Sequence, residues 1–244
     1  MKRYKAMSVV LVWGVLLGWS LAPAIGAGSG SMKHKMTHKE KDSGWVSLFD
    51  GKTTKGWRGF RSETFPKKGW EVVDGALHHI ARAGGGDIIN EKQYDDFDFT
   101  FEWKVAPGAN SGVFFRVSED YTPTYKTGIE YQILDDARHH DGKNPLTSAA
   151  SNYALYPRTD GTLKPVGEYN TGRILAKGNH VEHWLNGKKV VEYEIGSEDW
   201  NKRIAQSKFA GWEHFGKMRK GYIGLQDHGN DVWFRNLKIR PLSK

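Results

Sequence analysis

Two neighbouring segments of the chain carry ionisable and amide side chains in a pattern that suits proton transfer on a polar substrate. They are Asn-Ser-Gly-Val-Phe-Phe-Arg at residues 110–116 and Thr-Gly-Ile-Glu-Tyr-Gln-Ile-Leu-Asp-Asp at residues 127–136. Short runs rich in β-branched and aromatic residues, bounded by turn residues, predict two β-strands. Because strand side chains alternate between faces, Glu130 and Gln132 should share one face. A one-residue β-bulge would bring Asp135 onto that face as well.

Arg116 should share a face with Phe114 on the first strand, so that a guanidinium, carboxylates and an amide could meet on adjacent strands. Arg116 would then clamp a substrate oxygen through its fork of donors. The spacing of the acidic strand resembles the E-x-D-x-x-E strand of laminarinase-like glycosidases, with Gln132 at the middle position and Asp135 at the last. A plainer interpretation stays open, because one face of an antiparallel sheet often simply meets water.

Five candidates come from the second half of the chain. His228 lies in a glycine-bounded turn after a predicted strand, where an imidazole can act as acid, base or ligand, and Gln226 alternates onto the same face. Glu168 and Asn170 follow a Pro-Val-Gly loop near the expected cleft. Trp184 could stack on a sugar ring. Each also has a structural interpretation, as a polar turn residue, a solvated loop residue or a core tryptophan.

A long loop after residue 136 contains the adjacent histidines His139 and His140. Long loops in compact domains often carry function. The two imidazoles could form a metal-binding rim, and the plainer interpretation is a solvated loop.

The N-terminal residues predict export. Basic residues at positions 2, 3 and 5, an apolar run at 7–21 and small residues up to position 27 are typical of a secretory signal peptide, residues 1–27. The apolar run is short for a membrane span, which needs about 20 residues, so cleavage is favoured over an uncleaved anchor. We therefore expect a periplasmic or secreted bacterial protein with no stable membrane insertion. The chain has no cysteine, which excludes disulfides and a lipoprotein anchor.

Residues 28–43 contain almost no apolar side chain and are predicted to be a disordered linker. Removing the three basic residues of 1–27 lowers the formal net charge from +8 to +5. The linker holds four lysines and two acids, or +2 of that remainder, so the body is close to +3. This balance leaves no basic face that would indicate a nucleic-acid partner.

Residues 44–244 are predicted to form a single all-β domain, a two-sheet antiparallel jelly-roll sandwich. Residues 97–105 alternate between apolar and polar side chains, as a strand with one buried and one wet face does. The dipeptides Asp74-Gly75 and Asn186-Gly187 predict tight hairpins.

Near the C-terminus the pattern changes once from strand to helix. Residues 197–206 are predicted to be a short helix with Ser197 as its N-cap and acidic residues in its first turn. A final hairpin is expected between residues 222–227 and 232–239.

Taken in order, several short motifs resemble the 3-keto-disaccharide hydrolase domain family. Each is weak alone, and together they span about residues 45–241. They are Leu-Phe-Asp-Gly at 48–51, Trp-Glu-Val-Val-Asp-Gly at 70–75, Asn-Ser-Gly-Val-Phe-Phe-Arg at 110–116, Glu-Tyr-Gln-Ile-Leu-Asp at 130–135, Gly-Glu-Tyr-Asn at 167–170, His-Trp-Leu-Asn-Gly at 183–187, Ile-Gly-Leu-Gln-Asp-His-Gly at 223–229 and Val-Trp-Phe-Arg-Asn at 232–236. The resemblance implies a concanavalin A-like jelly roll that acts on glycosides oxidised to a ketone at C3. One departure is Tyr169, where Trp is common in the family.

A ketone at C3 acidifies the C2 proton, so a base can remove it and the enolate can expel the C1 leaving group, after which water adds. Such a site needs a base, donors or a cation at the enolate oxygen, and an acid. A divalent metal held by Glu130 or His228 would suit the enolate. The expected catalytic residues are Glu130, His228, Asp135 and Glu168, and the expected substrate-binding residues are Arg116, Gln132, Asn170, Trp184 and Gln226.

Two other functions stay open. One is an ordinary glycosidase that uses Glu130 and Asp135 as its carboxylate pair, and Gln132 at the middle position counts against it. The other is a non-catalytic carbohydrate-binding module, which the ionisable side chains of the two focal strands disfavour. In each case the partner is an oligosaccharide or glycoside.

Overall fold

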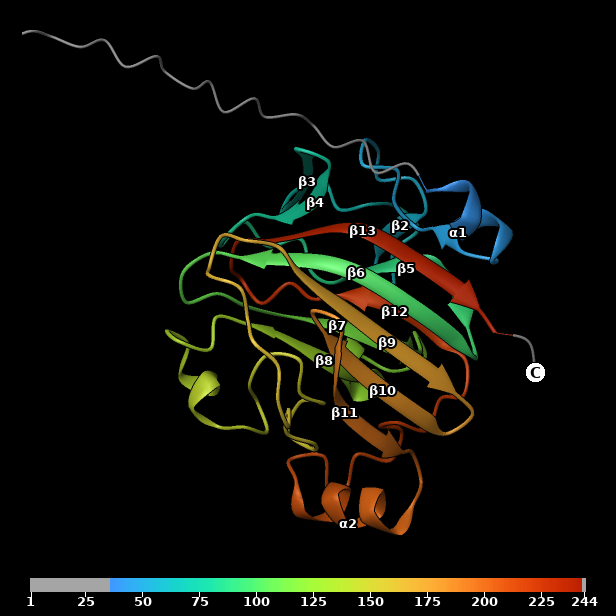
Figure 1. The fold of residues 1–244 in the computed structure, drawn as a ribbon, viewed down its shortest axis with the longest axis vertical. Coiled ribbons are helices and arrows are strands. Elements are labelled where there is room, and N and C mark those ends of the chain that lie inside the picture. The colour runs from blue at the N-terminus through green and yellow to red at the C-terminus, as the bar shows by residue number, and fades with distance from the viewer. Residues whose placement is uncertain (1–35, 243–244) are drawn as a thin grey trace, which may run out of the picture. The chain divides into compact units, whose positions relative to one another are not determined.

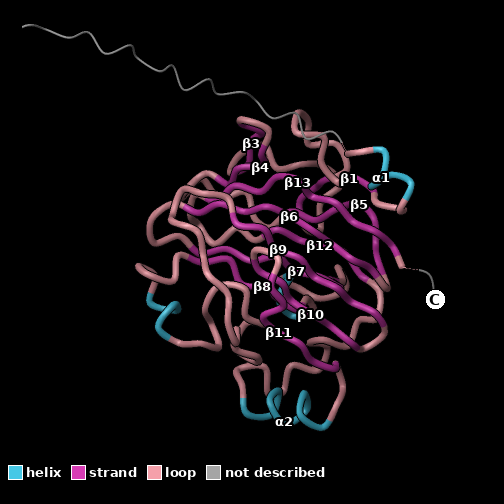
Figure 2. Tube along the Cα trace, in the orientation of Figure 1, coloured by secondary structure: helices cyan, strands magenta, loops and turns pink. Residues whose placement is uncertain are grey.

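The computed structural model describes residues 36–242, and the predicted signal peptide lies outside them. Within this range the chain folds into two antiparallel sheets that pack face to face (Figure 1), which confirms the all-β jelly-roll prediction. Coloured by secondary structure, the described chain consists mostly of strands and loops, and its helical segments are short (Figure 2). In chain order the elements are α1 (His38–Asp42), β1 (Val46–Ser47), β2 (Trp57–Gly59), β3 (Trp70–Val73), β4 (Ala76–His79), β5 (Ile88–Tyr94), β6 (Phe97–Val105), β7 (Asn110–Val117), a 3-10 turn (Thr124–Lys126), β8 (Ile129–Leu134), a second 3-10 turn (His140–Lys143), β9 (Asn170–Lys177), β10 (His180–Leu185), β11 (Lys188–Glu194), α2 (Glu198–Gln206), β12 (Gly221–Leu225) and β13 (Val232–Pro241).

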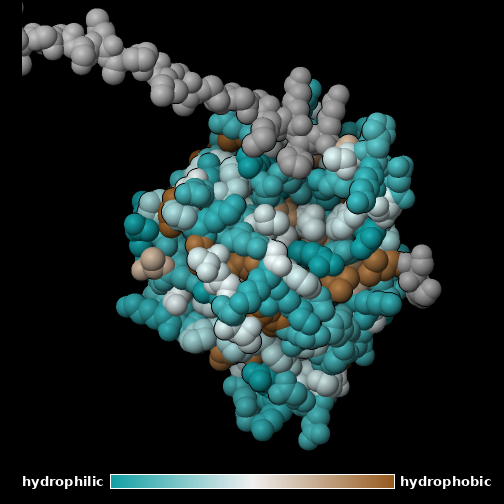
Figure 3. Space-filling view, in the orientation of Figure 1, coloured by the Kyte–Doolittle hydropathy of each residue, from teal (hydrophilic) through white to brown (hydrophobic). Residues whose placement is uncertain are grey.

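The larger sheet has the strand order β11-β10-β9-β6-β13-β4-β3, with β1 also paired to β13. Its strand β6 alternates as predicted, burying Phe97, Phe99 and Phe101 and turning polar side chains to the other face. Those polar side chains form ion pairs along the outer face, as between Arg173 and Asp98. The face drawn in Figure 3, where β6, β9, β10 and β13 lie in front, is accordingly mostly hydrophilic.

The smaller sheet has the order β2-β5-β12-β7-β8. Its inner face packs on the larger sheet through aromatic contacts. Tyr131 on β8 meets Phe101 edge-on, with ring centroids 5.2 Å apart, and lies 5.0 Å from the ring of His183 on β10. Because Tyr131 points inward, its neighbours in sequence Glu130 and Gln132 point to the outer face of the smaller sheet.

Local turn chemistry accounts for the hairpins. Asp74 and Gly75 both adopt positive φ, as do Asn186 and Gly187, and this is the geometry that two-residue hairpin turns require. Helix α2 begins after Ser197, whose side chain accepts a hydrogen bond from the Trp200 amide, so the predicted cap is confirmed.

Two expectations differ from the structure. Strands β12 and β13 belong to different sheets, so residues 226–231 cross between the two layers of the sandwich and close no hairpin. Residues 38–42 of the expected disordered linker form helix α1, whose Glu40 closes a capping box with Thr37 and pairs with Lys238 at 2.6 Å. Among the described residues, no helix is long and apolar enough to cross a bilayer.

Two loop regions cover the outer face of the smaller sheet beside β8. Residues 150–153 hydrogen-bond to β8 as an irregular extra edge, through Ala150 to the Gln132 carbonyl and Tyr153 to the Glu130 carbonyl. The inward-facing His183 donates from Nδ1 to the Ala150 carbonyl at 3.1 Å and so fixes this edge from the core. Residues 207–216 follow α2 and close the other side, with the Gly216 amide bonded to the Thr127 carbonyl.

Candidate active site

A pocket of about 280 Å³ lies on the outer face of the smaller sheet, between the sheet and the two covering loops. Strands β7 and β8 and the segment that follows β12 supply its floor, and residues from the loops supply its walls. We call it the Glu130 pocket. Its lining residues are Asn110, Tyr125, Gly128, Glu130, Gln132, Tyr153, Lys208, Phe209, Phe215, Gln226 and His228.

Glu130 has room in this pocket because a glycine stands on the neighbouring strand. In the antiparallel register Glu130 faces Phe114 and Gln132 faces Gly112. A Cβ atom placed on Gly112 would lie only 2.4 Å from Glu130 Oε1, so the carboxylate occupies the space that any other side chain at 112 would fill. The pair Gly112 and Glu130 therefore sets the position of the acid.

Burial under the loops makes Glu130 a weak acid. Its pKa is raised to about 8, chiefly because the carboxylate is removed from water. The positive charge of Lys208 opposes this shift, while the negative charges of Asp87 and Asp141 add to it. A carboxylate with a pKa near the working pH can accept a proton from carbon and later return it.

Lys208 is the one lysine or arginine among the residues that line this pocket. Its ammonium lies 4.0 Å from the ring centroid of Tyr153, and burial lowers its pKa. Sequence reasoning missed both residues. Lys208 follows helix α2 and Tyr153 lies in an irregular loop, so no periodic pattern links either of them to Glu130.

Two amide side chains bring unpaired acceptors to the pocket. Asn110 Oδ1 and Gln226 Oε1 are both buried and have no hydrogen-bond partner among the described residues. Leaving a buried acceptor unpaired costs about 1–3 kcal/mol, so a ligand that donates hydroxyl hydrogens would satisfy both. A polyhydroxylated substrate has such donors.

His228 and Gln132 line the same pocket but differ in their exposure to solvent. His228 is exposed at the rim, and its ring centroid lies 6.5 Å from that of His139. Gln132 is fully buried, donates from Nε2 to the Thr147 carbonyl at 3.1 Å and accepts from the Ile133 amide. Gln132 therefore positions the covering loop as well as lining the pocket.

The structure places Arg116 outside the pocket, contrary to the face expected from alternation. Arg116 adopts a φ of 55°, and the pairing of β7 with β12 shifts register at this point. This bulge turns the side chain toward the larger sheet, where it is 2% exposed and donates to the carbonyls of Gly178 and Asp95 at 2.8 and 3.2 Å. Its observed contacts are structural.

Asp135 does not join Glu130, because the expected bulge in β8 is absent. The register of β7 with β8 is regular from residue 129 to residue 134, and Asp135 begins the following turn. Its Oδ2 accepts the Gly108 amide at 2.7 Å, and its Oδ1 accepts the Ala137 amide at 3.1 Å. Its carboxylate therefore stabilises the turn that follows β8.

Three other expected site residues also lie elsewhere. Glu168 is exposed in the loop before β9. Asn170 is 3% exposed, and its Oδ1 accepts hydrogen bonds from Lys164 and Asn186. Trp184 lies on the outer face of the larger sheet, where its indole donates to Glu182 at 2.7 Å. All three lie on or before β9 and β10 of the larger sheet, and none of them lines the Glu130 pocket.

Two groups of side chains among the described residues bring potential metal ligands within 4.8 Å of one another. His139, His140 and Asp141 lie near the rim, beside His228. The other group lies on the larger sheet, where Lys189 already pairs with two of its carboxylates. Neither group contains the expected ligands Glu130 or His228. Because the group at 139–141 lies beside His228 and offers imidazole and carboxylate donors, it is the one of the two that suits an ion near the pocket.

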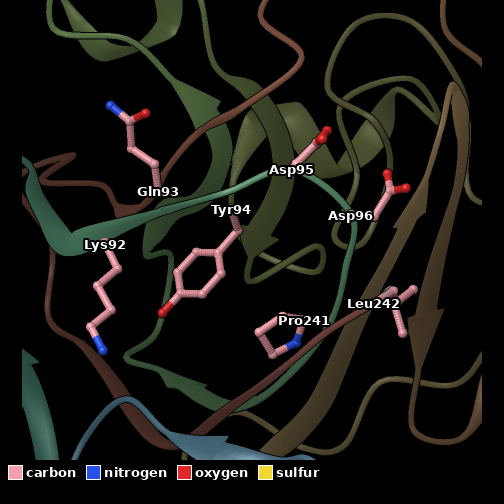
Figure 4. A pocket seen from close by; sticks show the side chains of 7 residues that line it. All are labelled: Lys92, Gln93, Tyr94, Asp95, Asp96, Pro241 and Leu242. Atoms are coloured by element: carbon pink, nitrogen blue, oxygen red, sulfur yellow. The ribbon is translucent and has the colours of Figure 1, made fainter. Parts of the chain in front are cut away.

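A second hollow of about 280 Å³ lies at the turn between β5 and β6 (Figure 4). In that view the side chains of Asp95 and Asp96 point away from Tyr94, and Asp96 is engaged by Arg219 at 2.7 Å. Its wall is mainly apolar and includes Pro241 and Leu242. The convergence of polar groups that distinguishes a ligand site is found in the Glu130 pocket instead.

Comparisons with known proteins agree on one family. The family model described as a 3-keto-alpha-glucoside-1,2-lyase-like domain matches residues 44–240. A Bacteroides thetaiotaomicron protein named 3-keto-disaccharide hydrolase is 34% identical over 229 residues, which cover 82% of this chain and 79% of the relative.

Two crystal structures from Parabacteroides distasonis, each described as a candidate glycosyl hydrolase, have a similar fold. One superposes with a TM-score of 0.79 at 35% identity and covers 86% of this chain and 99% of that one. The other has a TM-score of 0.62 at 28% identity and covers 81% and 99%.

Proposed function

Because the chain belongs to the family of 3-keto-alpha-glucoside-1,2-lyase-like domains, we propose that it cleaves 3-keto-glycosides by elimination followed by hydration. At the coarser level the chain is a glycoside hydrolase-like enzyme. One observation carries the finer proposal. A single carboxylate, Glu130, stands in a polar pocket with its pKa raised to about 8, which suits removal of a proton from carbon.

In the proposed reaction Glu130 and His228 exchange the protons, and both residues return to their starting states. Glu130 takes the C2 proton, and the bonding electrons move into the enolate of the C3 ketone. The bond between C1 and the glycosidic oxygen then breaks with its electron pair on that oxygen, which takes a proton from His228. Water next adds across the new double bond, with its oxygen on C1. Glu130 returns its proton to C2, and His228 recovers one from the water.

Lys208 is suited to stabilise the enolate oxygen. Among the residues that line the pocket it is the one lysine or arginine, and partial desolvation lowers its pKa, so its ammonium can meet negative charge that develops on a bound substrate. Asn110 and Gln226 would accept hydroxyl hydrogens of the sugar, which orients the ring over Glu130.

A divalent cation would fit the loop group His139, His140 and Asp141, whose imidazole and carboxylate donors suit such ions. When bound there, it would supply positive charge at the rim of the pocket.

Two observations disfavour the runner-up functions. A two-carboxylate glycosidase needs its second acid in the same pocket, and Asp135 is engaged in a turn outside it. A passive binding module has no use for a partly buried carboxyl with a pKa near neutrality, whereas perturbed pKa values are typical of catalytic sites.

The test compares turnover of methyl 3-keto-glucoside and unoxidised methyl glucoside by wild type, Glu130→Gln and a control, Glu63→Gln. Glu63 is exposed and does not line the pocket. We expect wild type to cleave only the keto substrate, and Glu130→Gln to lose roughly 10²–10⁴-fold of that activity. Equal cleavage of the unoxidised glycoside, or full activity in Glu130→Gln, would refute the proposal.

We also propose export, on the basis of the basic, apolar and small-residue segments of residues 1–27. Expression in a Gram-negative host followed by N-terminal sequencing should recover protein that begins between about residues 23 and 28. Recovery of Met1 on most of the protein would contradict cleavage.

A further inference from the structure

His228 and Gln226 reach the Glu130 pocket from residues 226–231, the irregular segment that crosses between the two sheets. Because these residues lie outside the strands, the position of their backbone depends on individual contacts rather than on a regular ladder of hydrogen bonds. Asp227 lies between His228 and Gln226 in sequence and does not line the pocket. The contacts that hold Asp227 therefore also position the imidazole of His228.

The carboxylate of Asp227 is held from three sides. It accepts the Gly86 amide and the Gly229 amide, each at 2.9 Å, and it lies 2.7 Å from His79 Nε2. His79 is completely buried, and its Nδ1 donates to the Asn230 carbonyl at 2.8 Å. The side chain of Asp227 is thus fully engaged by the protein, which leaves it the task of holding the segment in place.

The backbone of Asp227 is held by a second acid, Asp87, which immediately precedes β5. The Asp227 amide donates to Asp87 Oδ1 at 2.8 Å, and the Thr124 hydroxyl donates to Asp87 Oδ2. Thr124 is completely buried and begins the 3-10 turn whose next residue, Tyr125, lines the Glu130 pocket. Asp87 therefore joins two walls of the pocket without lining it.

The burial of Asp87 is unfavourable for an ionised carboxylate. Desolvation raises its pKa and the charge of Asp227 adds to the rise, while its two hydrogen bonds and the charge of His79 oppose it. The charge of Asp87 also contributes to the raised pKa of Glu130. Buried titratable groups of this kind are more frequent at functional sites than elsewhere, so Asp87 is a candidate for a role in the reaction.

We propose that Asp87 is a positioning residue that holds His228 where it can protonate the leaving oxygen. It accepts one hydrogen bond from the segment that carries His228 and one from the turn that carries Tyr125, and so keeps the two walls in register. The inference rests on the proposed function, and it adds a residue that does not itself touch the substrate.

The test compares two 3-keto-glucosides whose leaving groups differ in their need for a proton. Methoxide is a poor leaving group and requires protonation by His228, whereas 4-nitrophenolate departs without it. Misplacing a catalytic group by about 1 Å costs on the order of a hundredfold in rate. We therefore expect Asp87→Ala to lower kcat about a hundredfold for methyl 3-keto-glucoside and less than about tenfold for the 4-nitrophenyl compound. Each kcat is taken on the plateau of the pH–rate profile, so that a shifted pKa of Glu130 does not imitate the loss.

Three further variants separate position from charge and from general damage. Asp87→Asn can still accept the Asp227 amide and can donate to the Thr124 oxygen, so kcat should return to within about tenfold of wild type on both substrates. Thr124→Val removes the hydroxyl and should show the same preference between the substrates, with smaller losses. The matched control is Asp50→Ala, because Asp50 holds a turn through backbone amides and the Thr53 hydroxyl and does not line the pocket. It should leave both kcat values unchanged.

Equal losses of Asp87→Ala on the two substrates, or no loss on either, would overturn the inference and leave the proposed function in place. An Asp87→Asn variant as impaired as Asp87→Ala would also overturn it, because charge rather than position would then matter. Should Asp87→Ala fail to fold by circular dichroism, the ratio of the two losses in Thr124→Val decides by the same criterion. If wild type cleaves neither keto substrate, the proposed function fails, and the role of Asp87 fails with it.

Discussion

Replacing Glu130 with glutamine should stabilise the protein, and the gain should grow with pH. In the folded state the pKa of Glu130 is raised to about 8 from its ordinary value of 4.5. Between these values the folded state holds a proton that the unfolded state has lost, so ionisation of Glu130 makes folding stability fall as pH rises from 4.5 to 8. Glutamine has the same shape and no such proton.

The size of this effect follows from the two pKa values. At 1.36 kcal/mol per pKa unit, the carboxylate costs on the order of 1 kcal/mol at pH 5 and about 3 kcal/mol at pH 7, and approaches about 5 kcal/mol above pH 8. These are upper values, because Glu130 is only partly buried. A pH-independent loss from an unpaired glutamine amide would lower every value equally and leave the slope unchanged.

Thermal unfolding of wild type, Glu130→Gln and Glu63→Gln at pH 5 and pH 8 measures this slope. The gain of Glu130→Gln over wild type should rise by roughly 3 kcal/mol between the two pH values, or about 6–12 °C in Tm at 2–4 °C per kcal/mol. The exposed Glu63→Gln should show no such trend. A gain that is flat or falls with pH would show that Glu130 ionises normally, and the case for it as a tuned base would fail.

Three further changes test other parts of the site. Lys208→Gln should lower turnover at least tenfold, and because Lys208 opposes the raised pKa of Glu130, it should also shift the rising limb of the pH–rate profile above pH 8. Gly112→Ala places a Cβ 2.4 Å from Glu130 Oε1, so activity should fall more than a hundredfold while the far-ultraviolet circular dichroism spectrum is retained; full activity would show that the carboxylate does not need this space. Arg116→Met should cost roughly 2–4 kcal/mol of stability and change KM little, because its guanidinium holds the Gly178 and Asp95 carbonyls, and a raised KM at unchanged stability would return Arg116 to the substrate.

Local patterns predicted the parts of the fold whose causes are local. The Asp74-Gly75 and Asn186-Gly187 turns need positive φ at both positions, and these residue types tolerate it wherever they occur. Alternation on residues 97–105 predicts which side chains of β6 enter the core, although Asp98 on the outer face is also buried, beneath Arg173 and Arg240. Glu130 and Gln132 share a face for the same reason, and both line the pocket.

Long-range packing decided the rest. Arg116 points away from the pocket because of a bulge against β12, a strand more than 100 residues later, and no residue near 116 signals it. The sequence of β12, β13 and the turn between them predicted a hairpin, but the two strands lie in different sheets. A turn sequence does not determine which strands pair with each other. Lys208 and Tyr153 reach Glu130 only through the packing of irregular loops.

The residues of the site differ in how rigidly the fold holds them. Strand β8 is paired with β7 on one side and with residues 150–153 on the other, and Tyr131 anchors it in the core, so Glu130 is held rigidly. Lys208, His228 and Tyr125 lie on loops or turns whose sequences can change without disturbing the sheets. In the proposed reaction, proton removal at C2 requires the same geometry for every keto-glycoside, whereas the leaving group differs from one substrate to another. We therefore infer that β8 determines the reaction and that the loops determine which glycoside reaches it.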